Sequence, residues 1–382
     1  MATETTPVAG SSPRPAAVGA ENPFPRRVFE RLDAFCARLV EQAVSPHAAA
    51  VLRIGYGLLY LVFLLRELPH RNEIWGPGSP WTPALATQLS EQTGWLSILT
   101  LSDGRAYFES CYALALLASA LFTLGWRTRA VSVLFAVVVI SFHGRAIFMT
   151  DGADNLIRLM AIYLCFTACG RCWSLDARRT RLRASRYEAA RLPGRPEGHL
   201  WRHLVSARRQ LSTVVHNCAM FVIVAQICIV YGAAGLYKIQ GSSWQDGTAL
   251  HYVLNLSPFQ PWPALSQLMD SQPMMLAIAS YLSALLQVAF PFVLFSRIKY
   301  IVLTMLLGMH LGIAILLGLP LFSGAMIVAD AMFIPRRFYR YLGQAWRRAF
   351  RRTVSAPVAE ASSPAEAAVV PPRARSAVDP GR

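Results

Sequence analysis

The sequence predicts an all-α fold, a polytopic integral membrane bundle of about eight transmembrane helices. Hydrophobic residues make up 54% of the 382 residues and charged residues only 15%, whereas soluble proteins carry about 25% charged residues. The mean hydropathy is +0.37. Apolar runs of about 20 residues, enough to cross a bilayer as a helix, recur along the chain. These observations exclude an ordinary soluble domain.

The distribution of the basic residues predicts the orientation of the bundle. The net charge is +16, but the arginines cluster between apolar runs, as in oriented membrane proteins and unlike nucleic-acid-binding proteins. With eight crossings and both termini cytoplasmic, every basic segment falls on the cytoplasmic side. These segments are 1–47, 126–129, 171–210, 297–299 and 336–352. We therefore expect a multi-pass protein of the cell membrane that binds no nucleic acid and has the lipid bilayer as a partner.

The first four predicted helices are runs of Leu, Val, Ala and aromatic residues that end at Gly, Pro or charged residues. They occupy 48–68, 106–124, 130–148 and 154–170. A tight basic turn joins the second to the third, and a short turn at 149–153 precedes the fourth. The segment 69–104 holds Trp75, Trp81 and Trp95 among Gly and Pro residues, so we predict a loop at the membrane surface.

The last four predicted helices follow the same compositional pattern. They occupy 211–237, 273–295, 300–319 and 321–334. The arginine-dense segment 171–210 is predicted to be a cytoplasmic loop, and the nearly neutral segment 239–272 a loop on the opposite side. Outside the transmembrane domain, 48–335, the chain has a basic arm at 1–47, partly disordered, and a basic juxtamembrane segment with a disordered tail at 336–382. Both are rich in Pro, Ala and Ser.

The cysteines predict neither disulfides nor a metal site. Four of the seven lie in apolar runs, where cysteine acts as a small hydrophobic residue. Cys169 and Cys172 form a CxxC pair, but no second CxxC or HxxxH pair accompanies it, so we predict no metal.

One lysine stands at the end of the apolar run 211–237. Tyr231, Gly235 and Lys238 are spaced i, i+4, i+7 and share one helix face. Two interpretations are open for Lys238. The side chain extends its ammonium to the membrane surface, or it lies in a poorly hydrated pocket where burial favours the neutral amine, which is a base.

Further polar residues are expected on the same side of the membrane as Lys238. They are His143, Arg145, Asp151, Asp154, Trp244, Asp246 and His251, with Arg158 and His310 placed deeper. Charges at membrane depth cost a few kcal/mol each, so they pair or line a cavity. Asp154 and Arg158 are four residues apart on one predicted helix and can pair. A structural salt-bridge network and an outward-facing polar pocket suited to proton abstraction both fit this pattern.

Five motifs in order carry a resemblance to a known family. They are His143-x-Arg145, Asp151-Gly-Ala-Asp154-Asn, Trp173-Ser-Leu-Asp176, Tyr231…Lys238…Trp244-Gln-Asp246 and His310-Leu-Gly…Phe322-Ser. In this arrangement the chain resembles the HTTM family, as a bacterial-type member, over 48–335. This membrane domain is shared with vitamin K-dependent gamma-carboxylase.

The resemblance implies a catalytic site. In the animal carboxylase the matching lysine deprotonates vitamin K hydroquinone, and the oxygenated quinone then removes a glutamate γ-proton before CO2 adds. Lys238 is thus the expected base, His310 the second catalytic residue and a quinol the expected cofactor or lipid-soluble substrate. The expected substrate-binding residues are Arg145, Asp151, Asp154, Arg158, Tyr231, Trp244 and Asp246.

Two departures separate the chain from that carboxylase. The carboxylase has a functional histidine where 151–155 has none, and its large peptide-binding domain has no counterpart here. We therefore expect a carboxylase- or epoxidase-like enzyme acting on a quinol rather than on a protein substrate. Two alternatives remain, a transporter in which Lys238 and carboxylates bind a coupled ion, and a non-catalytic membrane protein that assists the maturation or export of a partner.

Overall fold

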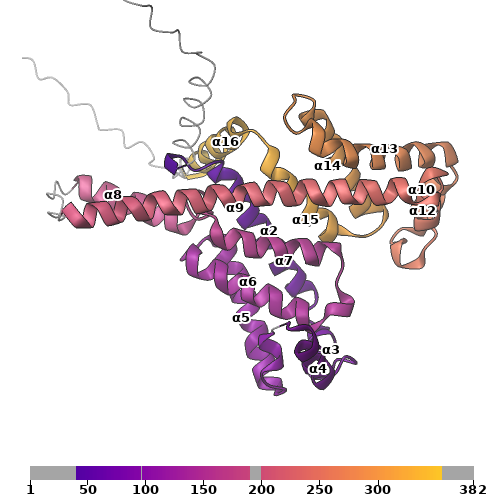
Figure 1. Ribbon diagram of the computed structural model, residues 1–382, viewed down its shortest axis with the longest axis horizontal. Helices are drawn as coiled ribbons and strands as arrows, with labels where there is room; N and C mark the ends of the chain where they lie inside the picture. The colour runs from indigo at the N-terminus through magenta and orange to yellow at the C-terminus, as the bar shows by residue number, and fades with distance from the viewer. Residues whose placement is uncertain (1–39, 96, 190–198, 355–382) are drawn as a thin grey trace, which may run out of the picture. The chain divides into compact units, whose positions relative to one another are not determined.

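In the computed structural model the described residues are 40–95, 97–189 and 199–354 (Figure 1). These residues form helices and turns with no strand. Most of the arm at 1–47 and of the tail that were predicted to be disordered lies outside them. The chain divides into two units, Met1–Arg336 and Arg337–Arg382. Helix α16, Arg336–Val354, starts at this division, and everything below concerns the first unit.

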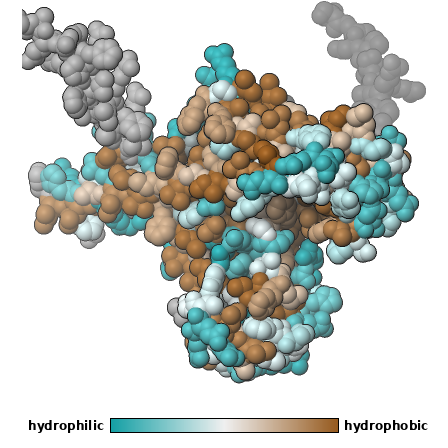
Figure 2. All heavy atoms as spheres, turned by 45° about the vertical axis from the view of Figure 1, so that its right-hand side comes forward, coloured by the Kyte–Doolittle hydropathy of each residue, from teal (hydrophilic) through white to brown (hydrophobic). Residues whose placement is uncertain are grey.

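Six of the described helices are long and apolar enough to cross a membrane. They are α2 (Pro46–Arg66), α5 (Arg105–Leu124), α6 (Thr128–Arg145), α9 (His199–Gln240), α13 (Pro273–Val293) and α14 (Lys299–Leu316). Between 22% and 56% of the residues in their most apolar windows are buried, so much of their apolar surface faces outward. Figure 2 shows wide apolar areas on the outside of the helices. The chain is therefore a multi-pass helical membrane protein.

Two further predicted crossings are shorter than a bilayer. Helix α7, Gly152–Phe166, has 15 residues and α15, Pro320–Asp330, has 11, followed by the 3-10 turn η4, Ala331–Phe333. At 1.5 Å per residue, 15 residues span about 22 Å, less than the roughly 30 Å hydrocarbon core. Length therefore supports six crossings, and the predicted count of eight depends on these two helices.

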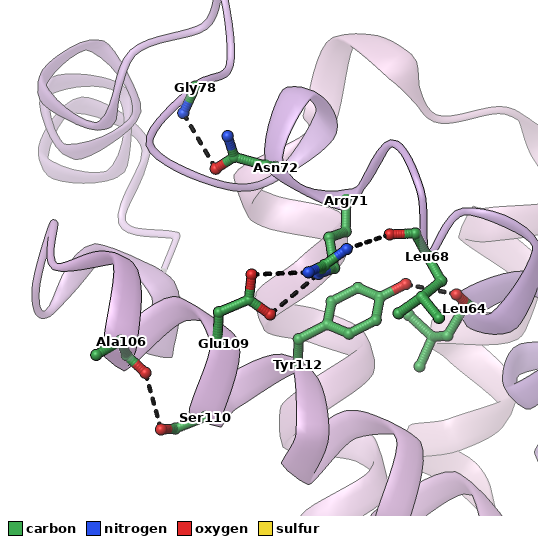
Figure 3. A network of polar contacts seen from close by, with 9 residues as sticks. All are labelled: Leu64, Leu68, Arg71, Asn72, Gly78, Ala106, Glu109, Ser110 and Tyr112. Carbon is green, nitrogen blue, oxygen red and sulfur yellow. Dashed lines mark hydrogen bonds and ion pairs between the residues drawn. The ribbon is translucent and has the colours of Figure 1, made fainter.

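The predicted loop 69–104 contains helices. These are α3 (Arg71–Ile74), α4 (Pro83–Thr93) and the 3-10 turn η1 (Ile98–Thr100). Arg71 fixes the start of this segment to α5 (Figure 3), because its Nε and Nη2 each donate to Glu109 at 3.0 Å while its Nη1 donates to the Leu68 carbonyl at 2.6 Å. Tyr112, one turn further along α5, donates to the carbonyl of Leu64 on α2.

The arginine-dense segment 171–210 is also largely helical. It holds α8, Leu175–Ala189, and the first turns of α9, which runs for 42 residues as one helix (Figure 1). The prediction placed the start of this helix at 211, where the apolar run begins. Hydropathy detects only the apolar part of a helix and not the polar turns that precede it. No Gly or Pro interrupts 199–231, so nothing in the sequence ends the helix at the membrane boundary.

Short helices also fill the predicted loop 239–272. They are α10 (Ser242–Gln245), α11 (Ala249–Leu254), the 3-10 turn η3 (Ser257–Phe259) and α12 (Pro263–Asp270). Gly247 has φ +71°, a conformation that favours glycine, and it turns the chain between α10 and α11. This segment lies at the C-terminal end of α9 (Figure 1).

Helices α9 and α13 approach each other closely at Gly235. A Cβ atom at this position would lie 2.5 Å from Val288 Cγ2 and 2.8 Å from the Val288 backbone nitrogen. The small residue therefore sets the distance between the two helices that carry most of the site described below.

The buried Arg53 of α2 stabilises the end of α7. Its side chain is inaccessible to solvent, and its Nη1 and Nη2 donate to the carbonyls of Cys169 at 3.0 Å and Trp173 at 2.6 Å. Carbonyls near a helix C-terminus lack helical partners, so they accept from two nitrogens of this buried guanidinium without a carboxylate, while Arg53 Nε is buried without a hydrogen-bond partner among the described residues.

Asp176 caps the start of α6, where N–H groups lack helical acceptors. Its carboxylate accepts from the N–H groups of Arg127 at 3.0 Å and Thr128 at 2.7 Å, and from the Thr128 hydroxyl at 2.7 Å. Burial alone would raise the pKa of Asp176. The bonds from Thr128 and Arg127 and the charge of Arg179 outweigh it and hold the pKa below its ordinary value.

We expect the substitution D176A to lower the free energy of unfolding by about 1 kcal/mol, because it removes the cap of α6. The folded-state pKa lies below that of the unfolded chain, so this stability is present above the unfolded-state pKa of about 3.9 and is lost as the pH falls through the folded-state pKa. Thermal unfolding followed by circular dichroism at pH 7 and pH 3 measures it. The gap between wild type and D176A should shrink at pH 3, and an unchanged gap would contradict the assignment.

Candidate functional site

A mostly apolar pocket surrounds the sequence-predicted residue Lys238. It has a volume of about 450 Å³, and α9 to α15 supply its walls. Lys238 is the only charged residue in its lining, and the remaining side chains are apolar apart from Ser283 and the Trp244 indole. Its apolar lining includes Leu250, Val253, Leu254, Met269, Met275, Leu276, Ala279, Met309, Ile313, Leu316 and Phe322.

The Lys238 amine has no carboxylate partner among the described residues. Its Nζ lies 3.4 Å from the Ser283 hydroxyl oxygen, to which it donates, and 4.5 Å from the centroid of the Trp244 ring. No ion pair joins it to any carboxylate of the described chain. A cation over an indole face is stabilised by roughly 0.5–2 kcal/mol, so Trp244 positions the amine at the pocket wall.

A buried polar group lies two helical turns before Lys238 on α9. The Tyr231 hydroxyl donates to Asp330 Oδ2 at 2.8 Å and, with His310 as the Nε2–H tautomer, accepts from His310 at 3.0 Å. These three residues come from α9, α15 and α14, and each is at most 1% exposed. The His310 ring lies 6.0 Å from the ring of Phe322, which lines the pocket. His310 is thus separated from the pocket by one aromatic side chain.

The side of the pocket formed by α11 and α12 is fixed by Asp270. This carboxylate bonds His251 Nδ1 at 2.5 Å and accepts from Asn255 Nδ2 at 3.1 Å. The hydrogen bonds from Asn255 and His251 lower the pKa of Asp270. Leu254 and Met269, which neighbour these residues in sequence, line the pocket, so this contact holds two of its walls together.

The other sequence-predicted residues lie elsewhere. Asp151 and Asp154 form a capping box at the start of α7, in which Asp154 Oδ2 accepts from the Asp151 N–H at 3.0 Å. Arg158 donates to Asn155 Oδ1 at 2.5 Å and lies 4.6 Å from the Trp95 ring. The predicted Asp154–Arg158 ion pair is wrong, because the cap and the indole hold these two side chains instead.

Arg145 and Asp246 are also outside the Lys238 pocket. Arg145 is 1% exposed, and its Nη2 donates to the Gly76 carbonyl at 3.2 Å. Asp246 is an exposed C-cap of α10. Asp154 and His143 instead line a separate hollow of about 210 Å³ with Arg66 and Glu67. The single polar pocket expected from the sequence is therefore divided between two places.

The structure adds residues that sequence reasoning did not single out as site residues. Ser283 and Phe322 line the pocket, and Asp330 bonds Tyr231. Asp330 had a signal, because it is the one acid in the apolar run 321–334. Phe322 had one too, because it belongs to the fifth motif, whereas Ser283 had none beyond its helix. Within the described ranges, no three His, Cys, Asp or Glu side chains are grouped so as to hold a metal.

We expect D270A to loosen α11 and α12, because it removes both bonds that join them. Hydrogen–deuterium exchange of the amides in 249–270 should become faster, while D246A, which removes an exposed carboxylate of the same segment, should leave it unchanged. Because the folded-state pKa of Asp270 is lowered, the contact stabilises the segment at neutral pH and is lost as the pH falls through that pKa. Equal exchange in both variants would refute the role of Asp270.

Comparison with known proteins identifies the part of the chain that builds this site. Residues 203–337 match the family model described as HTTM domain. No curated protein and no solved structure matches the chain. The matched segment includes every residue that lines the Lys238 pocket, together with Tyr231, His310 and Asp330. The pocket-bearing segment of this membrane protein is therefore similar to HTTM domains, in agreement with the resemblance that its motifs predicted.

Proposed function

We propose that this protein is a membrane enzyme in which Lys238 takes a proton from a quinol, or from another lipid-soluble hydroxyl compound, bound in the apolar pocket. One observation carries the proposal. A pocket of about 450 Å³ with an almost wholly apolar lining contains a single amine and no counter-ion in its lining.

The pocket has the size and chemistry of a site for a small apolar ring compound. Ligand pockets measure about 300–1,000 Å³ and combine apolar walls with a few polar groups. Met269, Met275 and Met309 contribute flexible thioethers, which adapt to a ring and its substituents. The Trp244 indole offers a flat face beside the amine.

The proposed step is a proton transfer. A quinol O–H bond breaks, the proton binds the neutral Lys238 amine, and a quinolate and an ammonium result. Before this step an ammonium would have no counter-ion, and after it the quinolate becomes one. The ion pair between ammonium and quinolate forms only as charge develops in the transition state, so it accelerates the proton transfer. His310 does not line the pocket, so we assign it to positioning α14 against α9 through Tyr231.

We also propose that the Lys238 pocket opens on the outer side of the cell membrane, with the termini inside. This orientation counts α7 and α15 as crossings, eight in all, and the crossing by α7 makes α9 run from the inner side to the outer side, where Lys238 lies. The turn of Arg297 and Lys299, the arginines of α8 and Arg336 then lie on the same side, in accord with the positive-inside rule.

Oxygen uptake tests the proposed base. A quinolate reacts with O2 faster than its quinol does, so uptake by menadiol in nanodiscs containing the protein reports the proton transfer. Because general bases contribute about 10²–10⁴-fold, we expect K238A and K238M to lower the protein-dependent rate by at least about 10²-fold. Unchanged rates in both would refute the base and favour a non-catalytic role.

A second pair of variants tests the pocket separately from the amine. Ala279 lines the pocket and Leu285 of the same helix is 64% exposed. We expect A279W to weaken menadione binding by about tenfold or more, because a new indole fills the cavity, and the matched L285W to leave it unchanged. Equilibrium dialysis of menadione against each variant measures binding. Equal effects of both variants would place the ligand elsewhere.

Labelling of engineered cysteines tests the orientation. Gln245 and Ser185 are both exposed, at opposite ends of the proposed crossings. In intact cells, an impermeant maleimide should label Q245C from outside and S185C only after the membrane is opened. The reverse pattern would invert the orientation but leave the pocket chemistry intact.

A further inference from the structure

Four arginines surround two adjoining hollows remote in sequence from the Lys238 pocket. The first hollow, of about 420 Å³, is lined by Arg129, Arg171 and Arg181. The second, of about 280 Å³, is lined by Arg129 and Arg208. Both share Arg129 and Thr167, so they form one continuous concave surface, which we call the arginine hollow. Helices α6, α8 and α9 and the chain after α7 contribute its walls.

Among the described residues that line the arginine hollow, four arginines face a single carboxylate, so their positive charge is only partly balanced. Asp176 is the only carboxylate in the lining, and its oxygens are already bonded to the start of α6. Arg129 Nη2 donates instead to the Ser212 hydroxyl at 2.7 Å, and Arg171 Nη2 to the Thr213 hydroxyl at 3.3 Å. Neutral hydroxyls orient these two guanidinium groups and leave their charge unbalanced.

The arginines also repel one another. Burial lowers the pKa of Arg171, and the nearby charges of Arg129 and Arg209 lower it further. Holding like charges together costs free energy that a bound anion would recover. Guanidinium groups bind phosphate oxygens through paired N–H donors.

The second part of the arginine hollow is apolar. Phe166, Leu211 and Val215 line it next to Arg208, and Phe166 and Leu211 are 58% and 65% exposed. Leu211 is also the residue at which the apolar stretch of α9 was predicted to begin. The surface therefore presents cations beside an exposed apolar strip at the edge of the membrane-spanning region, which is the pattern of a lipid and not of a soluble anion alone.

We propose that the arginine hollow binds an anionic phospholipid, with its phosphate between Arg129 and Arg171 and an acyl chain along Phe166 and Leu211. Basic hollows between membrane helices are known sites for acidic lipid headgroups. The site involves neither Lys238 nor the residues around it, so it stands or falls independently of the proposed enzyme.

Native mass spectrometry and thermal unfolding test the site with the full chain. Protein reconstituted in equal parts of phosphatidylglycerol and phosphatidylcholine should retain phosphatidylglycerol at least tenfold in excess after mild delipidation. R129Q/R171Q should lose this preference. The matched R183Q/R186Q, which removes two exposed charges of α8 outside the lining, should keep it within twofold. Equal losses in both double variants would show non-specific surface attraction and overturn the site.

A second double variant controls for loss of binding by misfolding. Two ligands test whether the site binds a phospholipid or free phosphate. No hydrogen bond joins Arg181 or Arg208 to another side chain of the described chain, so R181Q/R208Q should fold normally and still lower the preference severalfold. Short-chain phosphatidylglycerol should raise the Tm of the wild type, and inorganic phosphate at the same concentration should not. An equal rise with inorganic phosphate would overturn the lipid assignment, and unaltered retention by R181Q/R208Q would overturn the site itself.

Discussion

The hydroxyl of Tyr231 determines how the pocket-bearing helices meet. It donates to Asp330 and accepts from His310, so one side chain of α9 joins α15 and α14 in an apolar interior. A buried polar group without a partner costs about 1–3 kcal/mol, which makes any arrangement that separates these three residues unfavourable. Helix α15 also packs on α2, where Tyr56 donates to the Ala325 carbonyl at 3.0 Å. Through α15, the bond between Tyr231 and Asp330 therefore connects α9 to α2 at the start of the membrane domain.

The sequence predicted the membrane-spanning helices well, because apolar length is a local property. The boundaries of α2, α5 and α13 agree with prediction to within two residues at each end. The start of α9 could not be predicted in this way, since a helix that leaves the membrane continues through Arg and Ser without a hydropathy signal. Likewise, the short helices α10 to α12 depend on contacts such as His251–Asp270, which bring together residues 19 apart.

The site was predicted in part. Lys238 and Trp244 line one pocket, and Tyr231 and His310 form a buried polar group beside it, because Tyr231 shares a helix with Lys238 and His310 lies on a neighbouring helix. Arg145, Asp154 and Arg158 do not join them. Their spacing was compatible with one pocket, but a capping box holds Asp154, while Arg158 lies over the Trp95 ring and Arg145 donates to the Gly76 carbonyl. A single sequence cannot distinguish a charged side chain that contacts another part of the protein from one that faces a ligand.

The length of α9 has a mechanical consequence. Forty-two residues make a rod of about 63 Å, roughly twice the thickness of the hydrocarbon layer. Only half of it fits inside, so with Lys238 near one boundary the other half must project into water. That projecting half carries the exposed side chains of Leu200, Trp201 and Leu204, at 73%, 58% and 55%. Exposed apolar side chains on a helix in water are unfavourable. We therefore expect lipid headgroups or another polypeptide to cover this part of α9.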